Sequence, residues 1–384
     1  MNELTTFDLP THIAYSQSIT ANITINLSHS CAQAMSLADL VQLSPVDFTN
    51  INLEYASLRG SEELRLAICR YYQQYSQSVL SKSNSLSPDD VVTFCGGQEA
   101  LAAIYQTVLK PGDEIVVFTP CYPSLISMAE QMGCSVNIVE LNQANAWQFS
   151  IDEVESLMSA KTKLLVLNSP HNPTGGVIDT NLSKQLLALA IKYQCYLIAD
   201  EVAQASNYYQ LPLTNDYLSY DKAISVGVMS KSLGLAGVRI GWVVSKNQAW
   251  LSQLIAVKAT GSICISAIDQ ALAICALMHS NEIIDNNNRL ILKNIDLVKH
   301  FINEYNHLFE WVEPKAGMLA LVKYLGSEGV EVLSANMANN YGVLILPSKL
   351  FGLSGNFFRL GLGQNNLSTG LGALKDYCTD FKPT

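Results

Sequence analysis

A lysine and an aspartate, each placed at the end of an apolar run, are the side chains of this sequence best suited to chemistry. Lys231 lies in the apolar, glycine-containing stretch 228–234. A lysine that is desolvated beside a cation has a lowered pKa and can attack a carbonyl carbon. Asp200 follows the apolar run 196–199, where burial of its carboxylate requires a positive partner. A protonated ring nitrogen is such a partner, and the ring then acts as an electron sink.

Residues suited to binding a phosphate come after another apolar run. Gly96, Gly97 and Gln98 open a predicted helix, so their backbone amides can hold a phosphate at the positive end of that helix. Arg239, eight residues after Lys231, can complete the cradle as a bidentate partner.

Tyr122 and Asn172 are suited to contacting an aromatic ring. Tyr122 can stack on such a ring, and Asn172 can donate a hydrogen bond to a phenolate oxygen on it. Taken one at a time, all these residues have ordinary structural roles, such as a turn asparagine, a helix-capping aspartate or a solvated lysine. Taken together, they specify one ligand, an aromatic aldehyde that carries a ring nitrogen and a phosphate.

The elements that must position these residues are strands of one sheet. Short apolar runs, separated by helical stretches, occur at 91–95, 115–119, 136–139, 164–168, 196–199, 223–228 and 240–245. Their nearly continuous hydrophobicity is typical of strands covered on both faces, as in a parallel sheet flanked by helices. We therefore predict an α/β fold with a seven-stranded, mostly parallel sheet. Every candidate residue follows a predicted strand, at the carboxyl end where open α/β sheets bind ligands.

The C-terminal part of the chain predicts a smaller α+β domain. A helical stretch covers about 265–305, and strands are expected at 319–323, 343–347 and 357–360. The serine-rich residues 76–90 indicate a surface loop. The expected division is an N-terminal segment 1–45 near the active site, a large domain 46–265, and an interdomain helix with the small domain at 266–384.

Composition excludes several classes of function. The chain has 384 residues, a net charge of −10 and 15% charged residues, so a nucleic-acid or anionic-membrane partner is not expected. Its nine cysteines contain no C-x-x-C pair, which argues against a disulfide framework or a metal site. The N-terminus is unlike a signal peptide and no apolar run approaches 18 residues, so a cytoplasmic location is expected.

The stretch 230–242, which contains Lys231 and Arg239, resembles a motif of class I/II aminotransferases, a family of fold type I pyridoxal 5′-phosphate (PLP) enzymes. Residues 168–175 resemble the family's Asn-Pro-x-Gly segment, and residues 200–202 resemble its aspartate-bearing strand end. The resemblance covers roughly residues 25–365. It implies that PLP is the cofactor and that Lys231 carries it as a Schiff base and removes the Cα proton of an L-amino acid. The other cofactor contacts that it implies are Gly96, Gly97, Gln98, Tyr122, Asn172, Asp200, Ser230 and Arg239.

The resemblance also implies roles for residues near both ends of the chain. Tyr55 matches the tyrosine that reaches the phosphate of the neighbouring subunit, which implies a homodimer with shared active sites. Arg359 matches the arginine that binds the α-carboxylate of the substrate. Asn172, Ser28 and His29 are predicted to contact the substrate in the same site. The expected partner is thus a small amino-acid substrate.

Three positions depart from the family pattern. Ala203 stands where a tyrosine usually bonds the ring oxygen of the cofactor, and Val228 stands where a serine often contacts the phosphate. Residues 27–30 replace a loop that often carries a glycine. His29 is either a surface residue or, if it lines the pocket, a proton donor that ordinary transaminases do not need there.

These departures leave three functions open. Transamination is favoured by the family. A PLP-dependent lyase or cyclase, similar to capreomycidine and enduracididine synthases that act on hydroxylated arginine, is the main alternative. Its guanidinium group would need an acidic partner, for which Glu3, Asp8 and Glu54 are candidates. A non-catalytic PLP-binding regulatory module is the third.

Overall fold

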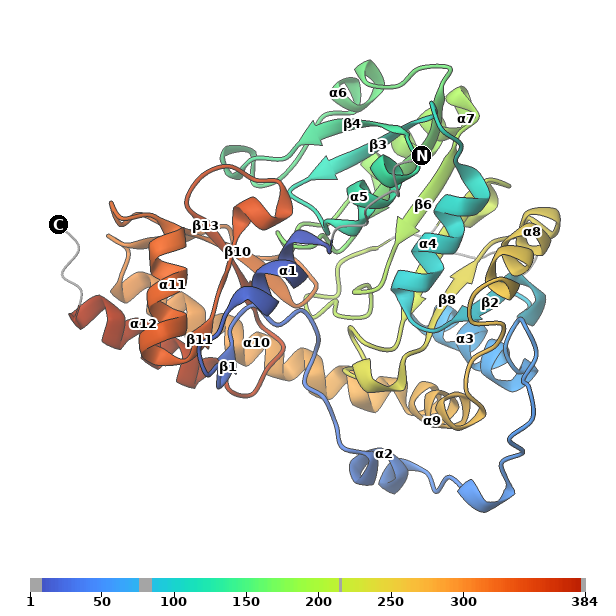
Figure 1. The fold of residues 1–384 in the computed structure, drawn as a ribbon, viewed down its shortest axis with the longest axis horizontal. Helices are drawn as coiled ribbons and strands as arrows, with labels where there is room; N and C mark the ends of the chain where they lie inside the picture. The colour runs from blue at the N-terminus through green and yellow to red at the C-terminus, as the bar shows by residue number, and fades with distance from the viewer. Residues whose placement is uncertain (1–8, 76–84, 214–215, 381–384) are drawn as a thin grey trace, which may run out of the picture.

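The computed structural model describes residues 9–75, 85–213 and 216–380, and its largest element is a seven-stranded sheet (Figure 1). The strand order is β2-β8-β7-β6-β5-β3-β4, and β8 alone runs antiparallel to its neighbours. The seven strands are β2 (Val91–Phe94), β3 (Glu114–Thr119), β4 (Ser135–Glu140), β5 (Thr162–Asn168), β6 (Tyr196–Asp200), β7 (Ala223–Val228) and β8 (Gly241–Val244). This arrangement confirms the predicted α/β class and the mostly parallel sheet.

Helices cover both faces of this sheet because successive side chains of each strand point to opposite faces. Ile115 and Val117 pack with one group of helices, whereas Val116 and Phe118 pack with the other. The first group is α4 (Gly97–Val108), α5 (Ser124–Gln131) and α8 (Gln248–Ala259). The second group is α6 (Ile151–Ser156) and α7 (Thr180–Tyr193), with α3 (Glu62–Tyr75) and α9 (Ala267–Met278) covering the β2–β8 end. The near-continuous hydrophobicity of the strands follows from this two-sided burial.

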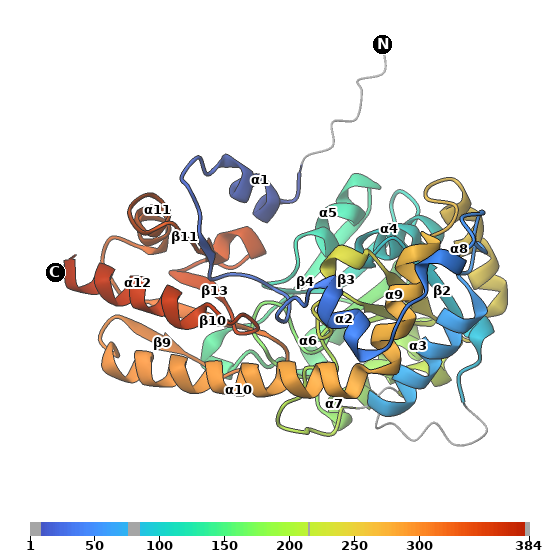
Figure 2. The same cartoon turned by 90° about the horizontal axis from the view of Figure 1, so that it is seen from below.

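The helical stretch predicted over 265–305 consists of two helices. The helix α9 ends at Met278, and α10 (Ser280–Glu304) begins after His279, whose φ of −107° and ψ of 18° interrupt the regular helix. The helix α10 runs from the large sheet to a second, four-stranded sheet (Figure 2). Among the described residues, no helix is long and apolar enough to cross a membrane.

The second sheet is antiparallel and has the strand order β12-β13-β10-β9. Its strands are β9 (Phe309–Trp311), β10 (Leu319–Tyr324), β12 (Leu346–Pro347) and β13 (Phe357–Gly361), and α10, α11 (Val330–Tyr341) and α12 (Leu367–Asp380) pack against it. The strand predicted over 343–347 is wrong as a single element. It is divided between β12 and β11 (Val343–Leu344), which pairs with β1 (Ile25–Asn26) outside this sheet.

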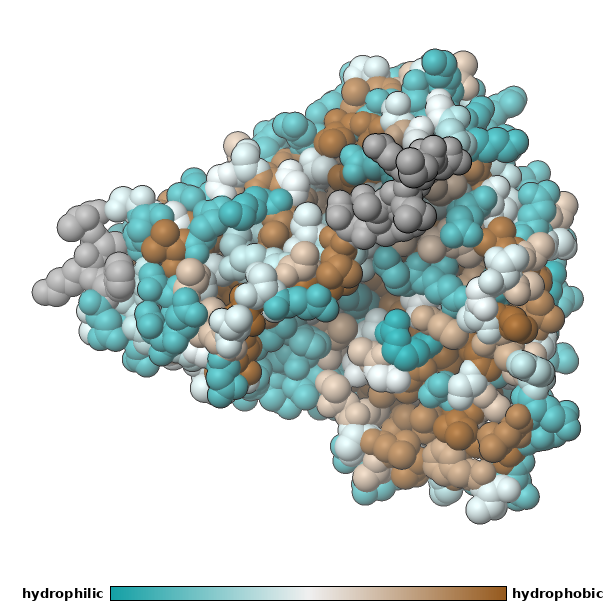
Figure 3. Space-filling view, viewed as in Figure 1, coloured by the Kyte–Doolittle hydropathy of each residue, from teal (hydrophilic) through white to brown (hydrophobic). Residues whose placement is uncertain are grey.

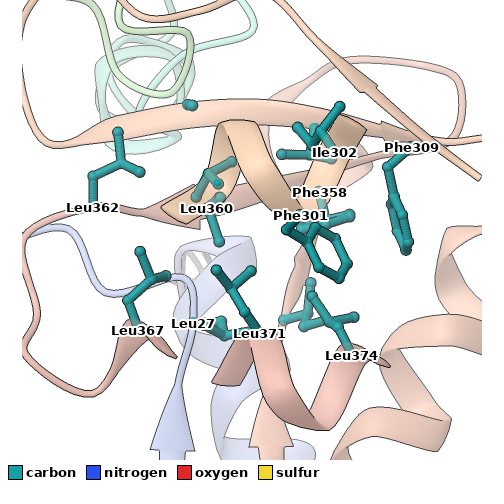
Figure 4. Close-up of a cluster of buried hydrophobic side chains, with 14 of the residues drawn as sticks. Leu27, Phe301, Ile302, Phe309, Phe358, Leu360, Leu362, Leu367, Leu371 and Leu374 are labelled. Carbon is teal, nitrogen blue, oxygen red and sulfur yellow. The ribbon is translucent and has the colours of Figure 1, made fainter. Parts of the chain in front are cut away.

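The N-terminal segment is anchored in the core of this C-terminal unit. Leu27 is buried among α12 and β13 side chains, including Leu371 and Leu360 (Figure 4). A Cβ added to Gly370 would lie 2.4 Å from Leu27 Cδ2, so only glycine lets the helix approach this closely. The chain then continues from Leu27 toward the large sheet, while α1 (Thr11–Ser18) crosses the junction of the two sheets (Figure 1). The predicted division at residues 45 and 265 stays a prediction.

Candidate active site

A cavity of about 230 Å³ lies at the carboxyl ends of the parallel strands. Its lining brings together eight of the residues predicted from strand ends, with others from the N-terminal segment. The lining residues are His12, Ser30, Gly97, Gln98, Leu101, Tyr122, Asn168, Asn172, Asp200, Val202, Val228, Ser230, Lys231 and Arg239. A single cavity therefore contains the groups from which a phosphate, a ring nitrogen and an aldehyde were inferred.

Lys231 follows β7 and presents its amine to this cavity. Nζ donates a hydrogen bond to Ser30 Oγ over 2.9 Å. Burial lowers the pKa of Lys231 and the positive charge of Arg359 lowers it further, while Cys31 and Asp200 act in the opposite direction. A lysine in this setting has the raised fraction of neutral amine that covalent attachment to a carbonyl requires.

Asp200, at the end of β6, is a buried carboxylate that fits a cationic ring nitrogen. It is 5% exposed, and Oδ1 accepts a 3.4 Å hydrogen bond from the Val202 backbone. Burial raises its pKa to about 6. Asp200 takes part in none of the ion pairs between described residues, so a protonated nitrogen in the cavity would supply the missing positive charge.

The opening turn of α4 and Arg239 form a cradle that fits a phosphate. Gly96, the residue before α4, has a φ of +91° and leaves no side chain over the helix end. A Cβ there would lie 2.5 Å from Arg239 Nη2. The guanidinium donates to Ala236 O over 3.2 Å and to Cys95 O over 3.5 Å, so it is held at the positive end of the helix.

Tyr122 and Asn172 flank the same cavity. Tyr122 Oη donates to Gln98 Oε1 over 3.0 Å, and Gln98 Nε2 donates to Ser124 Oγ over 3.1 Å. The backbone of Asn172 donates to Asn168 Oδ1 over 2.7 Å. The side chain of Tyr122 and the backbone of Asn172 are thus held in place by neighbouring residues.

Arg359, on β13, is a buried cation that fits a carboxylate ligand. It is 5% exposed, and its guanidinium carbon lies 4.6 Å from the centre of the Phe351 ring. Nη2 donates to Ser28 O over 2.8 Å and Nη1 to Asn172 Oδ1 over 3.4 Å. Burial lowers its pKa to about 10, so it stays charged at neutral pH. It has no carboxylate partner in the part of the chain that the structure describes.

Ser28 and His29 lie beside Arg359 but do not line the cavity. The buried Ser28 hydroxyl donates to Arg359 O over 2.5 Å and accepts from Leu346 N over 2.9 Å. Its contribution is therefore to position Arg359. The Nδ1 atom of His29 accepts from Cys31 N over 3.3 Å. Burial lowers the pKa of His29, and the charges of Lys231 and Arg359 add to that effect.

Tyr55 does not line the cavity of its own chain. It is 86% exposed and lines a separate surface depression with Leu53, Glu54, Ser262, Cys264, Ile265, Ser266 and Ala267. Its contact with a neighbouring subunit stays a prediction. Glu54 lies in the same depression, and Glu3 and Asp8 are outside the described residues.

Two of the residues that line the cavity, His12 and Ser30, were not predicted from the sequence. Ser30 follows two residues that were singled out, and this adjacency could have identified it. His12 had no such indication, because it reaches the site only through the packing of α1. Of the departures from the family pattern, Val228 lines the cavity, whereas Ala203 packs against the apolar core of the C-terminal unit.

Comparisons with known proteins agree with this geometry. The family model described as aminotransferase class I and II matches residues 29–369. The chain is 28% identical to an aspartate aminotransferase of Thermotoga maritima over 337 residues, or 85% of this chain and 83% of that protein. It is also 28% identical to capreomycidine synthase of Streptomyces vinaceus over 288 residues, or 74% of each chain. A PLP-dependent aminotransferase from Streptococcus suis superposes with a TM-score of 0.87 at 23% identity, covering 97% of this chain and 98% of that one.

Proposed function

The chain belongs to the aminotransferase class I and II family of PLP-dependent enzymes, and we propose that it transfers the amino group of an L-amino acid to a 2-oxo acid. The observation that carries this proposal is that Lys231 and Asp200 line one cavity, while Arg359 is hydrogen-bonded to Asn172 of the same lining. Lys231 can bind an aldehyde, Asp200 can bind a ring nitrogen, and Arg359 can bind a substrate carboxylate. When bound, PLP supplies an aldehyde carbon and an electron-accepting ring.

The residues of the chain then have distinct tasks. Arg359 binds the α-carboxylate of the amino acid, and its two hydrogen bonds to Ser28 and Asn172 fix the guanidinium plane. Lys231, with its lowered pKa, accepts the proton from Cα. Asp200 keeps a proton on the ring nitrogen. Ser30 Oγ, 2.9 Å from Nζ, orients the amine within the cavity, and such positioning favours proton transfer.

We propose a homodimer in which Tyr55 of one chain reaches the phosphate site of the other. The large apolar side chains Leu53 and Tyr55 are 77% and 86% exposed, and Leu37, Phe48, Ile263 and Ile268 are exposed as well. Hydrophobic residues gather on the surface over α2 (Leu37–Leu43) and α9 (Figure 3). Apolar surface of this kind is typical of an interface.

Mixing two inactive variants tests the shared site. When Tyr55→Ala and Lys231→Ala chains are refolded or expressed together, a hybrid dimer has one site with both residues. About a quarter of the wild-type activity is then expected, because half of randomly paired dimers are hybrids with one complete site of two. Activity that stays at the level of the separate variants would contradict the shared site.

A lyase or cyclase activity is the second candidate, and two observations favour it. Capreomycidine synthase is among the relatives, and His29 lies close enough to Lys231 and Arg359 for their charges to lower its pKa. The regulatory module has no support, since the matching relatives are named aminotransferases and a synthase.

Product analysis separates the two activities. The holoenzyme is incubated with amino acids, including hydroxyarginine, with and without a 2-oxo acid, and the products are identified by mass spectrometry. Aminotransfer requires the acceptor and yields a new 2-oxo acid. A product that has lost water or closed a ring, formed at the same rate without an acceptor, would replace aminotransfer by the lyase or cyclase activity.

A further inference from the structure

The helix α1 is fixed to the C-terminal unit and projects over the cavity. Thr11 Oγ1 donates to Leu350 O over 2.8 Å, and the hydroxyls of Tyr15 and Ser334 share a 2.7 Å hydrogen bond. Tyr15 also packs against a small apolar cluster that includes Phe351. These contacts define the orientation of α1 and hence of His12, its second residue.

His12 lines the cavity and lies between two aromatic side chains, Tyr122 from the loop after β3 and Phe351 from the short helix η7 (Ser348–Phe351). Its ring lies 5.3 Å from the ring of Tyr122, edge to face, and 6.3 Å from that of Phe351. Phe351 also stacks on the guanidinium of Arg359. The imidazole and the guanidinium therefore both lie next to the Phe351 ring, and the charge of Arg359 is close enough to lower the pKa of His12.

Two buried nitrogen atoms next to the Phe351 ring have no hydrogen-bond partner among residues 9–75, 85–213 and 216–380. They are Nδ1 of His12 and Nε of Arg359. Buried polar atoms are usually paired, so an unpaired one in a cavity indicates a ligand or solvent group that pairs with it. Arg359 is assigned to the α-carboxylate, which leaves His12 for another part of the substrate.

The charges around His12 favour an anionic partner. The charged and titratable groups that face it are Arg359 from β13, Lys231 from the loop after β7, and Tyr122 from the loop after β3. The first turn of α1 has no acidic residue, and the positive end of a helix attracts anions. Asp200 is the one acid among the described residues that line the cavity, and it is assigned to the ring nitrogen. Among the described residues that line the cavity, a cationic side chain would therefore find no free counter-charge.

We propose that His12 binds the distal carboxylate of a dicarboxylic amino-acid substrate and takes up a proton from solvent when it does so. This inference rests on the proposed function, because it assigns the α-carboxylate to Arg359. Burial and the charges of Arg359 and Lys231 lower the pKa of the free imidazole to about 4, so it is neutral at pH 7. A carboxylate within hydrogen-bond distance reverses this effect and favours the imidazolium.

The test measures binding and proton uptake without turnover. Succinate and butyrate are titrated into the holoenzyme by calorimetry in two buffers of different ionisation enthalpy, near pH 7.5. Butyrate has a single carboxylate, so it measures the contribution of Arg359 and the cofactor. Succinate is expected to bind more tightly and to take up close to one additional proton per site.

Variants assign this proton to His12. In His12→Gln and His12→Asn the additional proton is lost and succinate binds roughly 10-fold or more weakly, while butyrate binding is unchanged. His300→Gln, which changes an exposed histidine of α10, behaves like the wild type. Cofactor absorbance and circular dichroism of each variant show that it is folded and loaded.

Three results would overturn the inference. One is equal proton uptake for the two ligands, another is unchanged succinate binding by both His12 variants, and the third is tighter binding of 4-guanidinobutyrate than of succinate. The proposed aminotransfer can be contradicted separately from the dicarboxylate site. If no amino acid exchanges its amino group with a 2-oxo acid but the additional proton depends on His12, aminotransfer is wrong and the dicarboxylate site remains.

Discussion

The two sides of the cavity are built in different ways. The side that we call the cofactor wall, Gly96, Gly97, Gln98, Tyr122, Asn172, Asp200, Ser230, Lys231 and Arg239, comes from the ends of neighbouring strands of one sheet. The side that we call the substrate wall consists of His12 and Ser30 from the cavity lining, together with Ser28, Phe351 and Arg359, which contact lining residues or one another. It joins the N-terminal segment to the C-terminal unit. The first depends on a shared scaffold of buried strands. The second depends on a few long-range contacts, so its geometry can change while the cofactor site is kept.

The largest expected effect is on the cofactor wall. Lys231→Ala should lower the rate of aminotransfer by at least about 10³-fold, because both covalent attachment and the Cα base are lost. Steady-state rates and borohydride reduction followed by peptide mass spectrometry measure the two effects. Lys163→Ala, an exposed lysine on β5, should be unaffected. A covalent label of equal yield in Lys231→Ala protein would show that another lysine carries the cofactor.

The next effect is on the substrate wall. Arg359→Gln leaves the substrate carboxylate without its buried cation, and kcat/KM should fall about 100-fold. The cofactor should remain bound with its normal absorbance, since Arg359 belongs to the other wall. Arg289→Gln, which removes an exposed arginine of α10, serves as the control. Loss of cofactor from Arg359→Gln would mean that the two walls are not independent.

A core variant tests what supports the substrate wall. Leu27→Ala removes a side chain buried against Gly370 and Leu371, and should cost about 2–3 kcal/mol of unfolding free energy. Because Leu27 precedes Ser28, whose carbonyl accepts from Arg359, KM should rise before cofactor affinity changes. Thermal unfolding and substrate titration measure both quantities, with exposed Leu66→Ala as control. An unchanged KM in the destabilised variant would show that Arg359 is positioned by other contacts.

The smallest effect concerns Glu201, the residue directly after Asp200 at the end of β6. Burial raises the pKa of Glu201 to about 8, and Ser225 donates a hydrogen bond to it. The folded state therefore binds this proton more tightly than the unfolded state, and this contribution to stability is lost as pH rises from about 4.5 to about 8. Glu201→Gln should flatten the pH dependence of the unfolding temperature in this range. An identical profile for both proteins would contradict it.

The difference between the walls also decided what could be predicted from the sequence. The seven strands of the large sheet were predicted to within two residues at each end, because burial on both faces makes each of them a continuous apolar run. Once the strands were known, the rule that ligands bind at their carboxyl ends predicted the residues around the cavity. The short strands β1 and β9 were not predicted, because neither of them is a continuous apolar run.

The substrate wall could not be predicted in this way. His12 reaches the cavity through hydrogen bonds of its helix to residues more than 300 positions away, and no local pattern encodes such a contact. The close approach of residues 28–31 to β13 is equally non-local. A Cβ added to Gly361 would lie 2.2 Å from His29 O. Arg359 was identified through the family resemblance, and its role remains a prediction.

The measurement that tests the central claim most directly is a single-turnover half-reaction. The holoenzyme is mixed rapidly with an excess of a good amino-acid substrate, without a 2-oxo acid, and the cofactor absorbance is followed. We expect complete conversion to the amine form, release of one 2-oxo acid per site, and recovery of the starting absorbance when a 2-oxo acid is added. Product formation over many turnovers with the starting absorbance unchanged would contradict aminotransfer by this enzyme.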